Sequence, residues 1–196
     1  MVRPSSGIIG LRAVMHRQRR VHARKAPRIP SCLLRHLPAM DPTFPAPPAL
    51  LPMAVVRCDV APLVSLGPGP YGERRYVPLL GGTVEGPGLR GSIEAGGVDW
   101  QINRADGVLD IAAHYVIVTP DGARVEVQSN GLRHGPPEVL ARLAAGEAVP
   151  RDEYFFRTLM RFTSGAPAWS HLNRVMAIAV GERLARQVQL HVYRLD

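Results

Sequence analysis

The most constraining feature of this sequence is an alternation of apolar and polar residues with a period of two, which begins at Val55 and continues to the C-terminus. Side chains of a β-strand point to opposite faces in turn, so this period predicts strands, whereas a surface helix repeats every 3.6 residues. Glycine- and proline-bearing turns divide the pattern into nine short segments: 55–66, 74–84, 89–95, 98–103, 108–119, 123–130, 154–163, 172–180 and 187–195. We therefore expect an all-β fold, a small antiparallel up-and-down β-barrel of about 8–9 strands.

The segments 108–119 and 123–130 form the clearest hairpin, because Gly122 in the turn between them can adopt a positive φ. In the second segment one face carries only polar residues, so it is either solvated or lines a polar cavity: Arg124, Glu126, Gln128 and Asn130. One short helix is expected at 137–145, where prolines stand at the start and Gly146 follows the end.

The basic residues are concentrated at the N-terminus. The chain has 24 Lys and Arg against 16 Asp and Glu, a formal net charge of +8. Residues 1–39 hold nine basic residues and no acidic one, so the rest of the chain has 15 basic and 16 acidic residues. A nearly neutral body does not support a nucleic-acid-binding face, and we expect no nucleic-acid partner. Nucleic-acid binding through the basic N-terminal segment stays open only if the chain starts at Met1. Residues 1–52 are predicted to be a basic, proline-rich, disordered leader, and residues 53–196 the barrel domain.

Two interpretations of the leader stay open. Its arginine-rich, acid-free composition resembles a mitochondrial transit peptide. Alternatively the gene start is over-extended, and Met40 or Met53 is the true first residue. Two cysteines, Cys32 and Cys58, form no disulfide framework and no metal-binding spacing, and no apolar run reaches the roughly 18 residues of a membrane helix. We expect a soluble cytoplasmic protein without a membrane partner, or a mitochondrial one if the leader is real and the source eukaryotic.

Four segments carry a resemblance to a known family: GGTVEGPGLRGSIEAGGVDWQ, ADGVLDIAAHYVIVTPDGARVEV, NGLRHGPPEVLARLAAGE and SGAPAWSHLNRVMAIAVGER. Together they resemble the bacterial and fungal family called domain of unknown function 3237 (DUF3237), also called uncharacterised protein family 0311 (UPF0311). The resemblance runs from about residue 59 to residue 195 and leaves the leader uncovered. It implies a small antiparallel β-barrel, and it implies no agreed general activity.

Common catalytic and cofactor-binding motifs are absent from the sequence. There is no nucleophile elbow, dinucleotide fingerprint or metal-ligand cluster, and the segment 67–72, GPGPYG, lacks the lysine and the following helix of a phosphate-binding loop. We therefore expect no metal and no cofactor. The chemistry must come from polar side chains on the strands.

Glu85 and Asp99 are the first catalytic candidates. Two carboxylates in a barrel, one with a pKa raised by burial, can act as general acid and base. The alternative is a structural role, in which they bond turn amides or pair with Arg90 and Arg104.

His114 is the third catalytic candidate. It shares a strand face with Asp110, two strand steps away, and the two could form an Asp–His pair; in the alternative reading the histidine ends in solvent or bonds a neighbouring strand. Arg157 lies among apolar neighbours, where it either anchors a carboxylate or carbonyl group of a ligand or covers apolar surface with its stem. Four more residues are substrate-binding candidates: Trp100, Gln101, Tyr115 and Asn173, the last on a predicted strand face shared with His171.

These residues favour a barrel that holds one small organic molecule, aromatic or carbonyl, in its interior or mouth. The reaction we favour is a cofactor-free isomerisation, cyclisation or dehydration by general acid–base catalysis. The alternative is a non-catalytic ligand-binding or structural barrel, so the sequence leaves open whether the protein is an enzyme. It also leaves the oligomeric state open, a homo-oligomer included.

Overall fold

The structure is a computed structural model, and it describes residues 45–196. In chain order the elements are β1 (Leu50–Val60), β2 (Val64–Gly69), β3 (Gly72–Glu85), β4 (Gly91–Ile93), β5 (Val98–Asn103), β6 (Leu109–Val118), β7 (Arg124–His134), α1 (Pro137–Ala144), β8 (Phe155–Thr163), the 3-10 helix η2 (Pro167–Arg174), β9 (Met176–Arg183) and β10 (Gln187–Leu195). Residues 1–44 of the expected leader lie outside the described residues. Met40 lies there too, whereas Met53 is part of β1.

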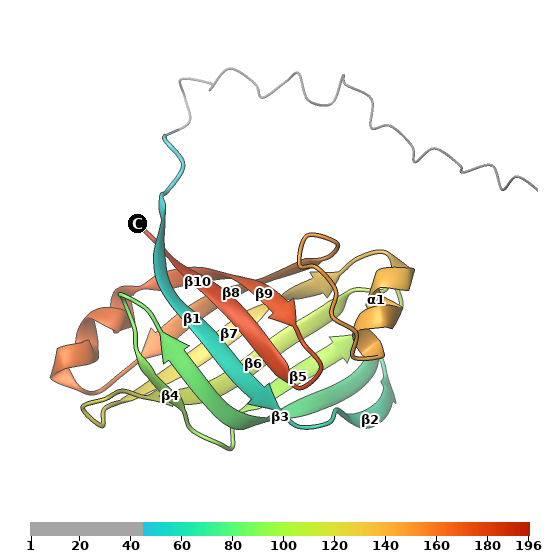
Figure 1. The fold of residues 1–196 in the computed structure, drawn as a ribbon, viewed down its shortest axis with the longest axis horizontal. Coiled ribbons are helices and arrows are strands. Elements are labelled where there is room, and N and C mark those ends of the chain that lie inside the picture. The colour runs from blue at the N-terminus through green and yellow to red at the C-terminus, as the bar shows by residue number, and fades with distance from the viewer. Residues whose placement is uncertain (1–44) are drawn as a thin grey trace, which may run out of the picture. The chain divides into compact units, whose positions relative to one another are not determined.

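The strands form one antiparallel sheet that closes on itself (Figure 1). Its order is β1-β10-β9-β8-β7-β6-β4-β3-β2, and β1 also pairs with β3, which joins the two ends. β4 and β5 both lie between β3 and β6 and run in the same direction, so they share one strand position that is interrupted at residues 94–97. β2 continues past the end of β1 along β3. The expected antiparallel barrel is confirmed, with eight strands in the closed ring and two extra strands.

The hairpin of β6 and β7 has the alternation that the sequence predicts. Val125, Val127 and Ser129 are buried inside the barrel, while the polar face of β7 lies outside. Gly122 in the turn has a φ of 79°, which a glycine adopts without steric cost. The period-two pattern therefore places this hairpin correctly, and the structure shows that its polar face is the solvated one.

The ring closes where β3 approaches β1 very closely. Gly82, opposite Cys58, has a φ of 141°, and a Cβ atom there would overlap the carbonyl oxygen of Arg57. Only glycine fits such an approach of two backbones. A register shift between Asp59 and Val60 follows directly along β1. We attribute the tight closure of the barrel at this seam to that glycine.

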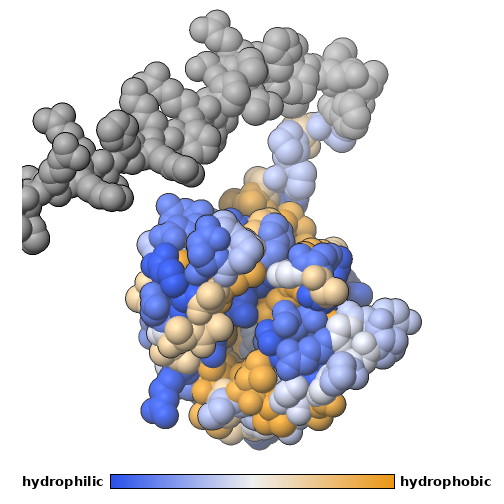
Figure 2. Space-filling view, turned by 90° about the vertical axis from the view of Figure 1, so that its right-hand side faces the viewer, coloured by the Kyte–Doolittle hydropathy of each residue, from blue (hydrophilic) through white to orange (hydrophobic). Residues whose placement is uncertain are grey.

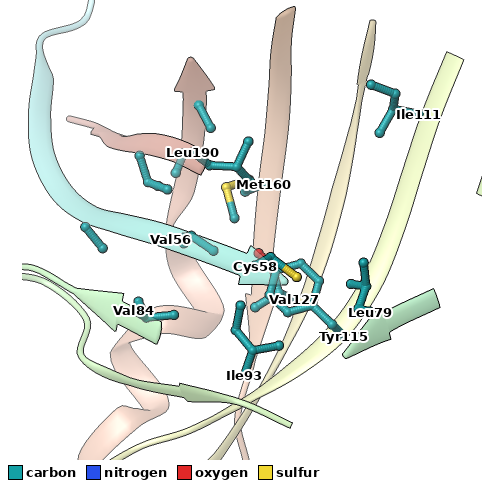
Figure 3. Packing of buried hydrophobic residues seen from close by; sticks show 14 of the residues in the cluster. Val56, Cys58, Leu79, Val84, Ile93, Ile111, Tyr115, Val127, Met160 and Leu190 are labelled. Atoms are coloured by element: carbon teal, nitrogen blue, oxygen red, sulfur yellow. The ribbon is translucent and has the colours of Figure 1, made fainter. Parts of the chain in front are cut away.

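Apolar side chains pack along the barrel interior (Figure 3), and those of Val84, Val127 and Met160 fill it away from α1. Val84, Ile117, Val125 and Val127 are fully buried there, and Met160 packs with them. Each such side chain contributes about 1.5–3 kcal/mol to folding by leaving water. A cavity lies toward the opposite end, next to α1.

Two helices lie at the ends of strands, where one was expected. α1 begins behind Pro136 and buries Val139 and Leu143, as predicted. The expected strand at 172–180 is wrong in its first residues, because η2 extends to Arg174 and β9 begins at Met176. Pro167 at the start of η2 favours a helical turn, and the single buried side chain of this helix is Leu172. Within residues 45–196 no helix is long and apolar enough to cross a membrane.

Candidate functional site

A cavity of about 350 Å³ lies inside the barrel next to α1. Its wall consists of inward-facing residues from β1, β3 and β5 to β10, and α1 adds Leu143 and Ala144. Figure 2 views the barrel from the end with α1 and β2 and shows a hollow, with hydrophilic residues around it and hydrophobic residues within. The volume is at the lower end of the range for pockets that bind small organic molecules.

Polar groups follow the cavity wall in an order that the strand register fixes. From the filled end toward α1, the inward positions of β6 come in steps of two residues: Tyr115, Ala113, Ile111 and Leu109. On β5, Asp99 pairs with Ala113 and Gln101 pairs with Ile111. On β7, Arg133 pairs with Leu109. The polar groups therefore come in the following order from the filled end to the α1 end: Tyr115, Asp99, Gln101 and Arg133.

Asp99 is the single carboxylate among the described residues that line the cavity. Its Oδ2 accepts a hydrogen bond from Gln101 Nε2 at 2.6 Å, and its Oδ1 is buried without a partner within residues 45–196. Burial raises the pKa of Asp99 to about 6, against the opposing effects of the Gln101 hydrogen bond and of Arg133. Asp99 can therefore gain and lose a proton near neutral pH.

Tyr115 adds a hydroxyl group at the deeper end. The side chain is buried, and its hydroxyl oxygen has no hydrogen-bond partner in the described part of the chain. Burial raises the pKa of Tyr115, so the hydroxyl keeps its proton and can donate it in a hydrogen bond. Two other hydroxyls on the wall satisfy each other, because Ser129 Oγ donates to Thr158 Oγ1 at 3.0 Å.

Three arginines surround the same cavity: Arg75, Arg133 and Arg183. Arg75 Nε donates to Gln101 Oε1 at 3.2 Å, which links Arg75 to Asp99 through one amide. Burial, and repulsion by the other two arginines, lower the pKa of Arg133 to about 10. The cavity is therefore a positively charged environment with one acid in its wall.

Cys58 is the one thiol in the described residues, and it also lines the cavity. Burial raises its pKa to about 12, with smaller contributions from Asp59 and Asp99. The thiol is thus protonated at neutral pH and a poor nucleophile. Within residues 45–196 no cluster of three or more His, Cys, Asp or Glu side chains is placed to hold a metal ion.

Comparison with known proteins places this barrel in a family. The family model described as "Protein of unknown function (DUF3237)" matches residues 48–195. The chain belongs to the DUF3237 family. It is 36% identical over 140 residues to a UPF0311 protein of Rhodopseudomonas palustris, covering 71% of this chain and 92% of that protein. It is 32% identical over 125 residues to a UPF0311 protein of Clostridium acetobutylicum, covering 64% of this chain and 79% of that protein.

Solved structures share the DUF3237 barrel. A conserved protein of unknown function from Rhodopseudomonas palustris superposes with a TM-score of 0.73 at 31% identity, over 78% of this chain and all of that one (100%). A β-barrel-like protein from Acinetobacter baumannii superposes with a TM-score of 0.68 at 38% identity, over 79% of this chain and 99% of that one. An enzyme from Penicillium herquei superposes with a TM-score of 0.59 at 20% identity, over 79% of this chain and 98% of that one. This likeness concerns the fold alone.

Three of the predicted site residues lie on the cavity wall of this DUF3237 barrel: Asp99, Gln101 and Tyr115. Asp99 and Gln101 are joined by a hydrogen bond. The suggested partner Arg104 is not near Asp99, since Arg104 pairs with Asp106 and Asp110. The roles of these three residues in binding or catalysis stay predictions.

The other two catalytic candidates lie outside the cavity. Glu85, at the end of β3, is exposed and pairs with Arg57 at 3.2 Å rather than with Arg90. His114 lies on the outer face of β6, where its Nε2 is 2.6 Å from Glu126 Oε1. The suggested pair of His114 with Asp110 does not form. The strand register explains why His114 pairs with Glu126 instead. Glu126 on β7 lies opposite Val116, two residues along β6 from His114, so the two side chains are diagonal neighbours on the outer face.

The remaining binding candidates are also on the outside. The guanidinium of Arg157 lies 5.3 Å from the ring centre of Phe155 and donates to the carbonyl of Phe156. Trp100 packs against Tyr76 and under Arg74 on the outer face of β5. Asn173 lies in η2 and not on a strand, so the expected face shared with His171 is wrong; its amide holds both backbone groups of Ser164.

Three cavity arginines were not predicted from the sequence. Arg75, Arg133 and Arg183 come from β3, β7 and β9 and occupy inward positions of their strands. One signal was available for Arg133, since it continues the inward series of Val125, Val127 and Ser129 at steps of two residues. No local pattern indicates that three distant strands bring their arginines to one cavity.

Proposed function

We propose that the cavity binds one small organic molecule with an aromatic or carbonyl group. Two features support this proposal. The wall is largely apolar, with a few polar groups at defined depths, which is the composition of small-molecule sites. In addition, Asp99 Oδ1 and the Tyr115 hydroxyl are buried without partners in the described chain, and a buried polar group without a partner costs about 1–3 kcal/mol. A bound molecule with a hydrogen-bonding group would relieve that cost.

We propose further that Asp99 moves a proton on the bound molecule. A carboxyl group with a pKa near 6 is a suitable base at neutral pH and, once protonated, a suitable acid. In the reaction we propose, the Asp99 carboxylate takes a proton from carbon or oxygen next to a carbonyl group, and Tyr115 donates a hydrogen bond to the carbonyl oxygen. Asp99 then returns the proton to another atom of the same molecule, which is an isomerisation or a ring closure without any net oxidation.

The observation that carries this proposal is the placement of Asp99 and Tyr115 together on one buried wall. The outer carboxylate Glu85 and the outer imidazole of His114 have no part in it. A barrel that only binds its ligand would use the same cavity without the proton transfer. The two functions differ in what the Asp99 side chain must do.

A thermal-shift screen of the full chain against aromatic and carbonyl metabolites tests binding first, because a ligand of the folded state raises the unfolding temperature. Ala113→Leu should abolish any shift, since Ala113 lines the cavity next to Asp99 and a larger side chain fills it. Glu85→Gln is the matched control on the outer surface. A shift that persists in Ala113→Leu would place the ligand elsewhere and contradict the proposal.

Turnover of any ligand found in this way is then followed by NMR in D₂O, where proton exchange on the ligand is visible. Asp99→Asn should keep the ligand within a few-fold of its affinity and lose turnover by a factor of about 10²–10⁴. If no ligand of the cavity exchanges a proton or reacts with the native protein, the barrel is a binding protein and the catalytic part of the proposal is wrong.

A further inference from the structure

The charges around the cavity do not balance. Three guanidinium groups contribute to the wall, those of Arg75, Arg133 and Arg183. Two carboxylates compensate them, because Asp99 is in the wall and Glu73 pairs with Arg75 at 3.4 Å. Cys58 and Tyr115 are neutral, since burial raises the pKa of both. One positive charge is therefore left over in a largely buried site.

The surplus charge is located at Arg133. Arg75 has Gln101 and Glu73 as partners, and Arg183 donates to the backbone carbonyls of Gln187 and Ala185. For Arg133, by contrast, the described residues provide neither a salt bridge nor a hydrogen bond to the side chain, and its Nε is buried without a partner. A buried donor of a charged group that lacks a partner is costly, and an anionic group of a ligand beside this guanidinium would offset that cost.

We propose that the ligand of this cavity is an organic monocarboxylate whose carboxylate group binds Arg133 at the α1 end. This inference rests on the proposed binding function and names the class of molecule. A carboxylate matches the fork of a guanidinium group with two parallel hydrogen bonds, and one negative charge neutralises the one surplus positive charge. A phosphate dianion would leave a negative charge among apolar residues such as Phe156 and Val188.

The order of polar groups along the wall gives the orientation of the bound molecule. Arg133 is at the α1 end. Asp99 lies two inward positions deeper and Tyr115 three, where successive inward positions are two residues apart along β6. A carboxylate held by Arg133 therefore directs the opposite end of the molecule toward Asp99 and Tyr115. The ligand should carry its carbonyl or hydroxyl group at that far end, with an apolar ring between the two.

Matched acids and amides test the inference with the full chain. The first pair is 4-acetylbenzoate and 4-acetylbenzamide, which share a ring and a ketone and differ in one charge, and further pairs vary the ring. Dissociation constants from ligand-detected NMR should favour the acids by about tenfold or more, the effect of one charge-assisted hydrogen-bonded pair. Arg133→Met should remove this preference, whereas Arg157→Met, on the outer face, should keep it.

A second readout does not depend on the choice of probe. Without ligand, Arg133→Met should raise the unfolding temperature, because it removes a buried charge that has no partner and keeps an apolar stem of similar length. An arginine with a purely structural role would instead lower it. Arg133→Lys keeps the charge without the fork and should retain part of the preference for acids.

The outcomes separate the two proposals. If acids and amides bind equally well and Ala113→Leu abolishes both, the cavity binds neutral molecules and the carboxylate inference is wrong while the binding function stands. If neither member of any pair binds and Arg133→Met lowers the unfolding temperature, Arg133 is a structural residue and both proposals fail. Preference for acids that survives in Arg133→Met would place the carboxylate elsewhere and also overturn the inference.

Discussion

Gln101 Nε2 donates a hydrogen bond to Asp99 Oδ2 at 2.6 Å, and Gln101 Oε1 accepts one from Arg75 Nε at 3.2 Å. Gln101 is buried, so both ends of its amide are satisfied inside the wall. The pairing fixes which end of the amide faces Asp99. One oxygen of Asp99 is thereby held, and the other is buried without a hydrogen-bond partner among residues 45–196.

The stability of the protein should depend on the ionisation of Asp99. Its pKa is raised on folding from 3.8 to about 6. Between about pH 4 and pH 6 the unfolded chain releases this proton while the folded chain keeps it, so the free energy of unfolding falls by up to about 3 kcal/mol as the pH rises. Well above pH 6 both states are ionised and this contribution is constant.

Asp99→Asn should therefore be more stable than the native protein by about 2–3 kcal/mol near pH 8 and about equal to it near pH 4. Urea unfolding at a series of pH values measures the difference. Glu85→Gln, at an exposed ion pair, should change the free energy of unfolding by less than about 1 kcal/mol throughout. A lower stability of Asp99→Asn near pH 8 would show that the ionised carboxylate is favoured on folding.

The buried hydroxyls of Ser129 and Thr158 should behave as one unit. Ser129→Ala removes one partner of a 3.0 Å hydrogen bond and leaves the Thr158 hydroxyl unsatisfied, at a cost of about 1–3 kcal/mol. Adding Thr158→Val removes the unsatisfied group, so the double variant should be less destabilised than the sum of the single variants. Strict additivity in denaturant unfolding would mean that the hydroxyls do not interact.

Cys58 should be unreactive in the folded protein. With a pKa of about 12, only about one thiol in ten thousand is ionised near pH 8. Iodoacetamide should modify it at least about 100-fold more slowly in buffer than in urea. Mass spectrometry of the tryptic peptide that starts at Cys58 separates it from Cys32. Equal rates in both solvents would contradict the buried placement of this thiol.

Residues 47–196 should fold without the preceding chain, because they form one compact unit. A chain that starts at Ala54 should be less stable. It lacks the pairing of Leu50, Leu51 and Pro52 with the end of β10, and it lacks Met53, whose side chain is buried. We expect the shorter chain to unfold several degrees lower in calorimetry, as for the loss of one large core side chain. Equal unfolding temperatures would mean that the start of β1 adds no stability.

The alternation of residues predicted the strands well because one face of each strand is buried. The segments 98–103 and 187–195 have the bounds of β5 and β10, and the expected helix matches α1 to within one residue. The pattern did not predict η2, whose Leu172 is apolar and stands directly before a strand. It also did not show that β4 and β5 share one position, because a break in a strand resembles a turn in sequence.

The site was less predictable than the fold. A period of two divides residues into two faces, and only ring closure determines which residues of different strands meet. Asp99 was predicted as one of two barrel carboxylates and Tyr115 as a binding residue, and both line the cavity. His114 was predicted from the strand face that it shares with Asp110, yet that face is the outer one. Arg133 lines the cavity together with Arg75 and Arg183 of other strands, and this grouping is long-range in sequence.

The most direct test of the account is an NMR titration of the Asp99 side-chain carboxyl carbon, assigned by its absence from Asp99→Asn, with and without a bound cavity ligand. We expect a midpoint near pH 6 in the free protein and a clear change of that midpoint when the ligand is bound. A carboxyl group that titrates near its ordinary value of about 3.9 and does not respond to the ligand would contradict it.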